Sequence, residues 1–384
     1  MSEKQMRAPR ILVAHNVARH GKGGMARMME SIHDQLEVRG WQIDYFTSES
    51  VPQGASARRR RHGFGWYVRQ FARHAYRNGR PYDVINIHEP AGLALVYGKA
   101  AMGNPAIVAM SHGLELRHWE LRMRAIPPGP ARPGWKERLA YPLTTLWQAG
   151  ITLRRADHVF CLNEQDKQYV HAQLGRKREE ISVVYPGVSG EFQHLAAGRS
   201  YAHGKRLLMN GSWIERKGSK VFVESFSELA SADNQYMLTI LGAGMDQQRV
   251  RAHFPEALHA RVFAPPMMDH AGCAQALIDH DIFVLPSYFE GTPLAMLEAM
   301  ATAMPLITTR TCGMQDVVRH GENGLLVEPG DANGLSSAIH RLATDAVLRQ
   351  QLGKAAAAAA PLYTWQRTAD VAERAYRRIC RDDA

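Results

Sequence analysis

Glu290 and Glu298 are the only acidic side chains in the segment 282–305, IFVLPSYFEGTPLAMLEAMATAMP. The short apolar run IFVL predicts a buried parallel strand, and the apolar stretch that follows Pro293 predicts a helix. Thr292 is a suitable N-cap for this helix and Pro293 a suitable first residue. Glu290 then lies in the loop and Glu298 inside the helix, where a buried carboxylate needs a partner because an unpaired charge is costly.

The same segment has the layout of a phosphate site. A strand, a loop with Gly291 and a helix N-terminus present backbone N–H groups that bind anions, and glycine lets a ligand approach closely. Glu298 lies about 7 Å further along the helix axis, and its side chain tilts back toward the N-terminus. We therefore expect a nucleotide here, with its ribose on Glu298 and with Glu290 facing the group beyond the phosphates. The binding residues expected from this segment are Gly291, Thr292, Pro293, Leu294 and Glu298.

Two neighbouring cations precede another helix in the same half of the chain. The strand-like run RLLMN, residues 206–210, is followed by GSWIERKG. Arg216 and Lys217 therefore lie in a strand-to-helix loop, where cations suit a diphosphate. A surface charge pair is the alternative interpretation. Gly242, in the GAG after the predicted strand 238–241, is a further candidate for nucleotide contact, although a lone GxG is a weak signal.

In the first half of the chain, a histidine and a glycine loop are the candidates. His112 follows the predicted strand 106–110, and the carboxyl end of a parallel strand is where ligands bind in open α/β sheets. His88 ends the preceding predicted strand in the same way. Gly23 and Gly24 lie between the first strand and a helix, but GKGG lacks the spacing of a Walker or a GxGxxG loop. A plain turn and a ligand-binding loop both fit this stretch.

The paired glutamates carry a family resemblance. Glu290 and Glu298, separated by seven residues, preceded by LPS and followed by AM, resemble the motif of the family 4 retaining glycosyltransferases, also called glycosyl transferases group 1. Residues 313–331, GMQDVVRHGENGLLVEPGD, are similar to the family's next segment. The resemblance implies the two-Rossmann GT-B fold, with Glu298 on the ribose of a nucleotide-sugar and Glu290 near the donor sugar. It also implies that His112 faces the donor sugar and the acceptor.

The resemblance also assigns the diphosphate site and shows where this chain departs from the family. Lys217 matches the family's Lys, but Ser212 stands where the family has Arg, so we expect Arg216 to take that role. Ala303 stands where the family usually has Gly. The Gly23–Gly24 loop is implied to touch donor and acceptor. We expect no metal or other cofactor, because these cations and backbone N–H groups can neutralise the leaving diphosphate. The expected catalytic residues are His112, Glu290 and Lys217.

Alternating strands and helices predict an α/β protein, and the resemblance implies two Rossmann-like domains that face each other across a cleft. It also implies an acceptor-binding domain, over residues 1–195, and a nucleotide-sugar domain, over 196–364, with the last helix, 365–384, packing back on the first domain. Residues 193–205 are typical of a linker, and the Pro-rich residues 117–138 of a mobile loop. The 384 residues are enough for two cores.

Composition narrows the class of protein. The chain is 45% hydrophobic and 22% charged, which indicates a globular protein. It has no apolar run long enough to span a bilayer and no signal-peptide core before the first strand. Its four cysteines lack metal-site or redox spacing. These features favour a cytoplasmic protein.

The net charge of +10 lies in the first half of the chain. Residues 1–195 hold 28 Lys and Arg against 17 Asp and Glu, whereas residues 196–384 hold 19 against 20. Within residues 56–80, Arg69, Arg73 and Arg77 recur on one predicted helical face, after the run Arg58 to Arg61. Tyr67, Phe71 and Ala75 recur on another face. A basic amphipathic helix with aromatic residues is typical of a membrane-surface segment, and an ordinary surface helix is the alternative.

The resemblance implies a retaining hexosyltransferase that uses a UDP- or GDP-sugar. The expected acceptor is a lipid-linked or cell-surface glycan precursor, as in polysaccharide or lipopolysaccharide biosynthesis, reached from the inner face of the membrane. The alternatives are a sugar phosphorylase or a nucleotide-sugar epimerase on the same fold, or a non-catalytic basic membrane- or RNA-binding protein. No nucleic-acid partner is expected, because no RNA-recognition motif is visible.

Overall fold

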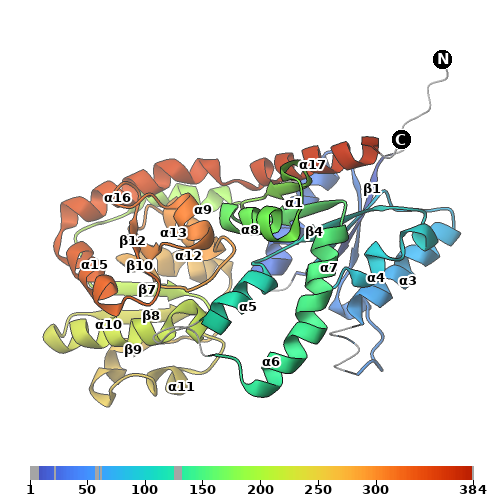
Figure 1. Cartoon of the computed structure of the whole chain (residues 1–384). Helices are drawn as coiled ribbons and strands as arrows, with labels where there is room; N and C mark the ends of the chain where they lie inside the picture. Colours follow the sequence, from blue (N-terminus) through green and yellow to red (C-terminus); the bar gives the residue numbers. More distant parts are fainter. Residues whose placement is uncertain (1–7, 21–22, 57–59, 61–62, 125–131, 383–384) are drawn as a thin grey trace. The chain divides into compact units, whose positions relative to one another are not determined.

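The structure, a computed structural model, describes residues 8–20, 23–56, 60, 63–124 and 132–382. The chain divides into two compact units: unit 1 comprises residues 1–120, 133–186 and 365–384, and unit 2 comprises residues 121–132 and 187–364. Each unit is built around a six-stranded parallel sheet with flanking helices (Figure 1). The predicted α/β fold class with two Rossmann-like domains is confirmed.

The sheet of unit 1 has the strand order β2-β1-β3-β4-β5-β6. Every described strand pair in it is parallel, so all six carboxyl ends lie at the same edge. Strands β1, β3, β4 and β5 are buried along their whole length, as expected for a sheet covered on both faces. The strands are β1 (Arg10–Ala14), β2 (Gln42–Phe46), β3 (Val84–His88), β4 (Ala106–Met110), β5 (His158–Cys161) and β6 (Ile181–Val183).

The helices of unit 1 agree with the sequence pattern at most positions. Glycine at positive φ commonly follows the end of a helix, and Gly40, at φ +88°, lies two residues after the last residue of α1. Asn163 caps α8 by accepting the Asp166 N–H at 2.8 Å, as its position predicts. The helices are α1 (Gly24–Val38), α3 (Phe64–Arg77), α4 (Leu93–Val96), α5 (Glu115–Arg124, which continues into unit 2), α6 (Trp135–Tyr141), α7 (Trp147–Arg155), α8 (Glu164–Leu174) and α17 (Trp365–Asp382).

Helix α17 belongs to unit 1, where it packs against α1. Tyr376 is fully buried, and its hydroxyl lies 2.9 Å from His33 Nε2. At the edge of this contact, Arg39 pairs with Glu373 at 2.7 Å and with Asp370 at 2.8 Å. A buried hydrogen bond and a set of ion pairs therefore fix the end of the chain to its beginning.

The basic helix differs from the prediction of an exposed arginine face. Arg69 of α3 is half-buried and packs against Gly98, where a side-chain carbon would overlap its guanidinium. Arg73 is also half-buried, whereas Arg77 is exposed. The reason is that Val68 and Ala72, the neighbours of these arginines in sequence, are core residues, so the arginine face lies at the margin of the core.

The arginine run before α3 lies mostly outside the described residues, which include Arg60 but not Arg58, Arg59 or Arg61. Arg60 donates hydrogen bonds to the backbone carbonyls of Ala55 and Gln53, at 3.0 and 2.6 Å. This arginine therefore holds its own loop rather than a ligand.

The Pro-rich stretch 117–138 was expected to be a mobile loop, and this is wrong for most of its length. Helix α5 covers residues up to Arg124, and α6 begins at Trp135. Residues 125–131 lie outside the described residues. Neither helix contains a proline, and Trp119 of α5 stacks on Tyr141 of α6, with ring centroids 5.1 Å apart.

The sheet of unit 2 has the strand order β12-β11-β10-β7-β8-β9 and is also parallel in every described pair. Its strands are β7 (Arg206–Asn210), β8 (Met237–Leu241), β9 (Val262–Phe263), β10 (Ile282–Leu285), β11 (Leu306–Thr309) and β12 (Leu325–Val327). Its helices are α9 (Gly190–Leu195), α10 (Ser219–Ala232), α11 (Gln247–Arg251), α12 (His270–Asp279), α13 (Leu294–Ala301), α14 (Cys312–Val317), α15 (Ala332–Thr344) and α16 (Ala346–Ala359). One continuous core joins the helices to this sheet.

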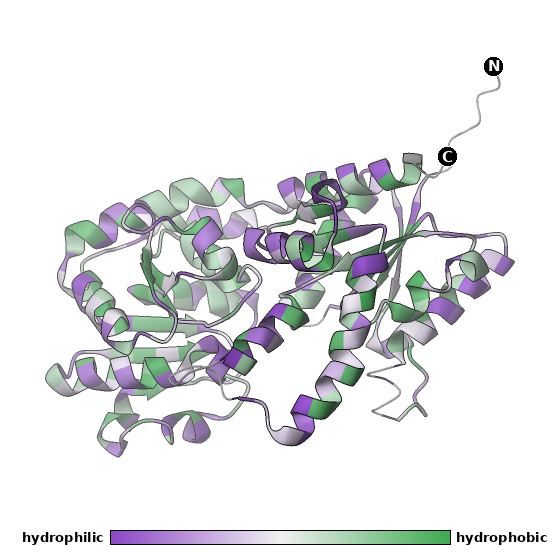
Figure 2. Ribbon diagram, in the orientation of Figure 1, coloured by the Kyte–Doolittle hydropathy of each residue, from purple (hydrophilic) through white to green (hydrophobic). Residues whose placement is uncertain are grey.

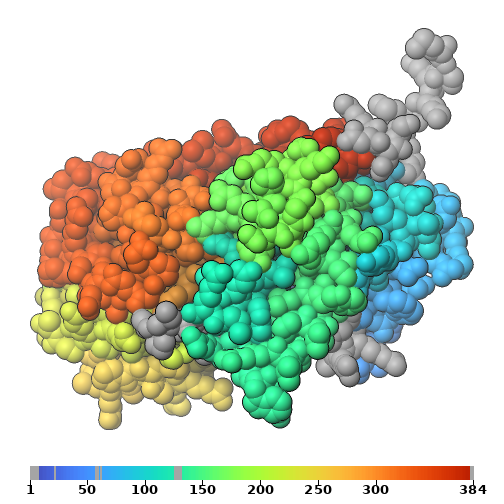
Figure 3. All heavy atoms as spheres, in the orientation of Figure 1, coloured from blue at the N-terminus to red at the C-terminus, as the bar shows by residue number. Residues whose placement is uncertain are grey.

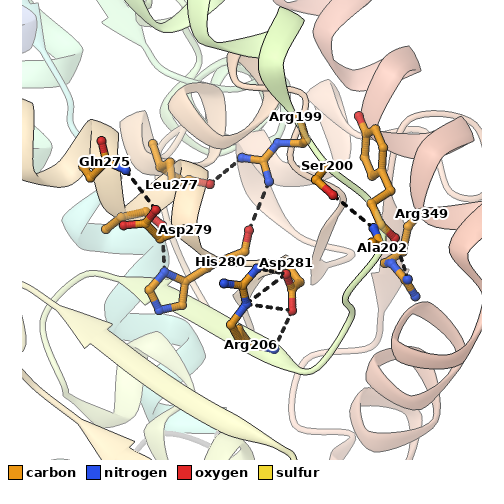
Figure 4. Close-up of polar contacts among 12 residues, drawn as sticks. Arg199, Ser200, Ala202, Arg206, Gln275, Leu277, Asp279, His280, Asp281 and Arg349 are labelled. Atoms are coloured by element: carbon orange, nitrogen blue, oxygen red, sulfur yellow. Dashed lines mark hydrogen bonds and ion pairs between the residues drawn. The ribbon is translucent and has the colours of Figure 1, made fainter.

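The segment expected to be a linker, 193–205, is instead held firmly to unit 2, and the units divide after Pro186 rather than after residue 195. Arg199 donates to the backbone carbonyls of Leu277 and, at 3.0 Å, of His280 (Figure 4). It also donates to the backbone carbonyl of Thr302 at 2.6 Å. Phe192, just before the segment, is fully buried in the unit 2 core. An arginine that satisfies the carbonyls at the ends of two helices anchors this stretch.

Figure 4 also shows the roles of the two aspartates in the DHD sequence at 279–281. Asp281 accepts from the Arg206 backbone N–H at 2.9 Å and pairs with its guanidinium at 2.7 Å. Asp279 accepts from Gln275 at 2.8 Å. Both carboxylates therefore serve local structure, Asp281 at the start of β10 and Asp279 at the end of α12.

No helix among the described residues is long and apolar enough to cross a membrane.

Candidate functional site

The candidate site of unit 2 lies where three neighbouring strands end. Strands β10, β7 and β8 are adjacent and parallel, so the loops that follow them meet at one edge of the sheet. Gly211 follows β7 and Gly242 follows β8, and the Gly211 N–H donates to Leu241 O at 2.9 Å. Both glycines have positive φ, +156° and +65°, which favours glycine at these turns. Gly211 also lies against the end of the Lys217 side chain.

Glu290 is buried between the two cations that the sequence singled out. Lys217 Nζ lies 2.6 Å from Glu290 Oε1, and Arg216 Nη1 lies 3.5 Å from Oε2. The Ser287 hydroxyl donates to Oε1 at 3.0 Å. Burial raises the pKa of Glu290, but the combined effect of Lys217, Arg216 and Ser287 lowers it below its ordinary value. The carboxylate is therefore ionised and holds both cations at one point.

The loop that carries the cations is fixed to the loop after β10. Arg216 and Lys217 end a short 3-10 turn, Glu215–Lys217, which is closed by Gly218 at φ +79°. A side-chain carbon at Gly218 would overlap Pro286 O, so the two backbones approach closely here. Arg216 also donates to Phe289 O at 2.8 Å. Arg216 thus reaches the same site as Lys217. The prediction that Arg216 takes the role of the family arginine requires this placement.

Helix α13 begins one residue later than the sequence suggested. Pro293 is the N-cap and Leu294 the first helical residue, so the prediction of Thr292 as N-cap is wrong. The physical reason is that the Gly291–Thr292 segment packs against Gly313 at the start of α14. The Gly313 N–H donates to Gly291 O at 2.8 Å, and any side chain at Gly313 would overlap Thr292 Oγ1. This contact shapes the loop at the helix N-terminus.

Glu298 lies in the middle of α13 and is only 4% exposed. The predicted burial of a carboxylate behind the helix N-terminus is therefore confirmed, while its role toward a ribose stays a prediction. Ala303, just past the helix, has φ +56°, the left-handed region that favours glycine. A glycine would therefore suit this position, where the family usually has Gly and this chain has Ala.

In unit 1 three histidines gather at the carboxyl edge of the sheet. His15, His88 and His112 follow or end β1, β3 and β4, which are neighbours in the sheet. Burial, and after it the proximity of the other two histidines, lowers the pKa of His112 to about 3. Burial likewise lowers the pKa of His88 to about 4. Nε2 of each finds no hydrogen-bond partner among the described residues. Two neutral imidazoles are therefore available to a ligand at this edge.

Glu89 and Glu30, which the sequence did not single out, complete this edge of unit 1. Burial and then Glu115 raise the pKa of Glu89 to about 8, so its carboxyl is largely protonated near neutral pH. Its Oε1 accepts the Glu115 N–H at 2.9 Å. Glu30 of α1 lies 3.5 Å from His15 Nε2. The sequence signal that could have indicated Glu89 is its position, because it directly follows the predicted strand that ends at His88. His112 lies in a similar place after the predicted strand 106–110.

The glycine loop is described only in part. Gly23 is the N-cap of α1 and Gly24 its first residue, and both are exposed. Gly21 and Lys22 lie outside the described residues. No described contact joins Gly23 or Gly24 to the histidines, so their predicted contact with substrates stays a prediction.

Comparison with known proteins gives a consistent result for both units. A family model described as "Glycosyl transferases group 1" matches residues 204–345, and one described as "Glycosyltransferase Family 4" matches residues 22–192. A phosphatidyl-myo-inositol mannosyltransferase of Mycobacterium leprae is 25% identical over 303 residues, which are 78% of this chain and 74% of that protein. The chain spans only 21% to 58% of the length of several other curated relatives.

Two solved structures show the same fold over nearly the whole chain. A sucrose-phosphate synthase from Thermosynechococcus elongatus is 20% identical with a TM-score of 0.75, and the match covers 97% of this chain and 99% of that one. The Anabaena protein HepE in complex with UDP and glucose is 17% identical with a TM-score of 0.66, covering 94% and 98%. At such identities the likeness establishes the fold and no more.

Proposed function

The chain belongs to the family 4 glycosyltransferases with the GT-B fold, and from this premise we propose that it transfers a hexosyl group from a nucleotide-diphosphate sugar to a glycan or lipid-linked acceptor, with retention of configuration. One observation carries the proposal. Lys217 and Arg216 converge on Glu290 in the loop between β10 and α13, and Glu298 is buried within α13. The cations and the helix N-terminus suit a diphosphate, Glu290 can face its sugar, and Glu298 can bind its ribose.

The proposed chemistry depends on the charge of the leaving group. The bond between the sugar C1 and the diphosphate oxygen breaks, and C1 bonds to the acceptor oxygen on the same face. The acceptor proton passes to the departing phosphate. Negative charge grows on the diphosphate as the bond breaks, so Lys217 and Arg216 favour the transition state over the ground state. Glu290 is ionised and paired with these cations, which suits a role in placing them and in facing the donor sugar rather than one as a free base.

The acceptor would bind at the histidine edge of unit 1. His112 and His88 are neutral, and each has a buried nitrogen that can accept from or donate to a sugar hydroxyl, depending on its tautomer. An acceptor linked to a lipid is supported by the name of the Mycobacterium leprae relative, a phosphatidyl-myo-inositol mannosyltransferase. We propose that the protein acts at the cytoplasmic face of a membrane in the synthesis of a polysaccharide or lipopolysaccharide. A uridine donor is favoured by the UDP and glucose bound in the Anabaena structure.

A screen of UDP- and GDP-sugars by calorimetry tests the donor part of this proposal. The wild type should bind one donor class, and Glu298→Ala should bind it more weakly, while the exposed control Glu256→Ala should bind like the wild type. Binding of no nucleotide-sugar would contradict the proposal.

Turnover with the donor so identified tests the reaction. Retention predicts that the product has the anomeric configuration of the donor sugar, which proton NMR measures. Activity that requires inorganic phosphate would instead indicate a phosphorylase, and conversion of the donor alone would indicate an epimerase.

A further inference from the structure

Residues 135–155 of unit 1 form one continuous helical rod with an irregular middle. Helix α6 (Trp135–Tyr141) runs into a π-helical turn, Pro142–Leu146, and then into α7 (Trp147–Arg155). The backbone stays in the right-handed helical region at both joints, at Pro142 and at Leu146. Pro142 lacks an N–H and its ring crowds the preceding turn, which accounts for the wider turn at this point. Figures 1 and 3 show this segment, coloured turquoise to green, as a ridge on unit 1.

The outer face of the rod is apolar and exposed. Trp135, Leu139, Leu143 and Trp147 follow one another at intervals of four residues and are 70%, 63%, 76% and 55% exposed. In a regular α-helix such a series drifts around the axis by about 40° per step. The π-turn holds more residues per turn and so counteracts the drift, which keeps Trp147 near the face of Trp135. Isolated exposed apolar residues are ordinary, but a row of four on one helix marks an interaction surface.

The second half of the rod packs closely on unit 1. Leu146, Ala149 and Leu153 of the same rod are buried, the last two completely. Helix α6 has no buried residue, so Trp135 and Leu139 lie on an exposed extension of a firmly packed helix. Figure 2 shows apolar stretches along it in green.

Charge is excluded from the middle of the rod and is positive at its ends. Residues 139–153 contain no charged side chain. Lys136 and Arg138 are exposed at the α6 end, and Lys136 Nζ lies 5.5 Å from the centre of the Trp135 ring. Arg154 and Arg155 are exposed at the α7 end, where Arg155 lies 4.7 Å above the Tyr97 ring. Glu137 is the only acidic residue of the rod.

We propose that the face formed by Trp135, Leu139, Leu143 and Trp147 docks on an anionic lipid bilayer, with the rod lying in the plane of the interface. Tryptophan prefers the boundary between headgroups and acyl chains, and leucine enters the apolar layer. Lysine and arginine at both ends would meet the phosphates of acidic lipids. A protein partner would need complementary acidic side chains beside its own apolar surface, whereas an acidic bilayer supplies both over the whole length of the rod.

This surface replaces α3 as the membrane contact expected from the sequence. The arginine face of α3 is partly covered by packing, since Arg69 lies against Gly98 and Arg73 is half-buried. Phe71 of α3 packs on Phe46, with ring centroids 5.3 Å apart, and is 40% exposed, less than any residue of the rod's apolar row. The inference goes beyond glycosyl transfer, because docking on a bilayer requires neither donor nor acceptor.

Flotation of the full chain with liposomes tests the inference. The wild type should float with phosphatidylcholine vesicles that contain phosphatidylglycerol, float much less with pure phosphatidylcholine, and be released by high salt. A variant with Trp135, Leu139, Leu143 and Trp147 all changed to Gln, called the rod variant below, should partition onto the anionic vesicles at least 10-fold less. All four side chains are exposed, so thermal unfolding should stay close to that of the wild type.

Two control variants keep the result specific. Leu362→Gln removes a leucine of similar exposure, 56%, from unit 2 and should float like the wild type. Changing Arg69, Arg73 and Arg77 to Gln should reduce flotation less than the rod variant does. The inference is overturned if the wild type does not float with anionic vesicles at low salt, or if the rod variant floats as well as the wild type. It is also overturned if sedimentation shows that the rod variant converts a dimer to a monomer, since the face would then be a protein interface. Nucleotide binding by the rod variant, measured in parallel, should be unchanged and reports on donor binding separately.

Discussion

Replacing Glu290 by Gln should strengthen the binding of a bare nucleoside diphosphate, although Glu290 belongs to the proposed active site. The carboxylate lies 2.6 Å from Lys217 Nζ and 3.5 Å from Arg216 Nη1, so it competes with a diphosphate for both cations. Glutamine removes the charge but keeps an oxygen that can accept from Ser287 and Lys217. The cations then stay in place with their charge no longer neutralised.

The size of the effect follows from the geometry. A phosphate oxygen paired with Lys217 would lie about 6 Å from the Glu290 carboxylate, where two unit charges repel by about 3 kcal/mol at an effective dielectric constant of about 20. Both side chains are at most 15% exposed, so solvent screens this repulsion only in part. We therefore expect the affinity for UDP, or for the diphosphate of the base found in the donor screen, to rise by about 10- to 100-fold. The turnover number should fall, because the carboxylate that we propose faces the donor sugar loses its charge.

Calorimetry with the nucleoside diphosphate, and initial rates with the nucleotide-sugar, measure the two effects on the same preparations. Glu256→Gln, an exposed glutamate of unit 2, is the matched control and should leave both unchanged. Weaker binding of the diphosphate by Glu290→Gln, with thermal unfolding close to that of the wild type, would refute the reasoning. In that case Glu290 would hold the donor directly rather than compete for its cations.

Three further outcomes are expected. Glu298→Ala should weaken nucleotide binding by about 1–3 kcal/mol, the loss of charge-assisted ribose bonds, and unchanged calorimetric affinity would exclude the ribose role. Lys217→Ala should lower the turnover number more than it alters sugar selectivity, while the exposed control Lys354→Ala should leave the turnover number unchanged. The wild type should keep its activity in EDTA. Loss of activity in EDTA that only a divalent metal restores would contradict the metal-free mechanism. The free energy of unfolding of unit 1 should fall on both sides of neutral pH. His33 and His88 have pKa values lowered to about 4 by burial, so the folded state binds fewer protons than the unfolded one, and stability is lost as the pH falls below 6.5 toward 4. Burial raises the pKa of Glu89 to about 8, so its contribution is lost as the pH rises from about 4.5 to 8. Urea unfolding should show a loss of stability between pH 6.5 and 8 in the wild type and not in Glu89→Gln; the same loss in both proteins would show that Glu89 is not its source.

Much of the fold follows from local patterns in the sequence. Short apolar runs such as IFVL and AIVAM predicted β10 and β4, and both are fully buried strands of parallel sheets. Gly40 and Asn163 marked a helix end and a helix start at the residues where the structure has them. These signals are reliable because glycine at positive φ and a side chain that caps a backbone N–H act within a few residues.

The candidate site was predictable as a set of residues but not as an arrangement. The strand–loop–helix pattern indicated a buried carboxylate at Glu298, and the adjacent cations indicated Lys217 and Arg216. No local pattern indicated that Glu290 pairs with those cations, since Lys217 and Glu290 are 73 positions apart in the sequence. Strand order alone decides this, because β10 and β7 are neighbours in the sheet although β8 and β9 lie between them in the chain.

The sequence by itself determined the α/β class, most of the strands and helices and the residue types at the two sheet edges. Only the tertiary structure decided which of those residues meet and which face of each helix is covered. The sequence predicted that the arginines of α3 form a free surface, yet Arg69 lies against Gly98. It predicted a loop for the Pro-rich stretch, yet that stretch leads into the helix that exposes Trp135. The physical reason is that helical periodicity defines a face but not its neighbour. Burial depends on packing between segments far apart in the chain, and free energy gained there outweighs local preference.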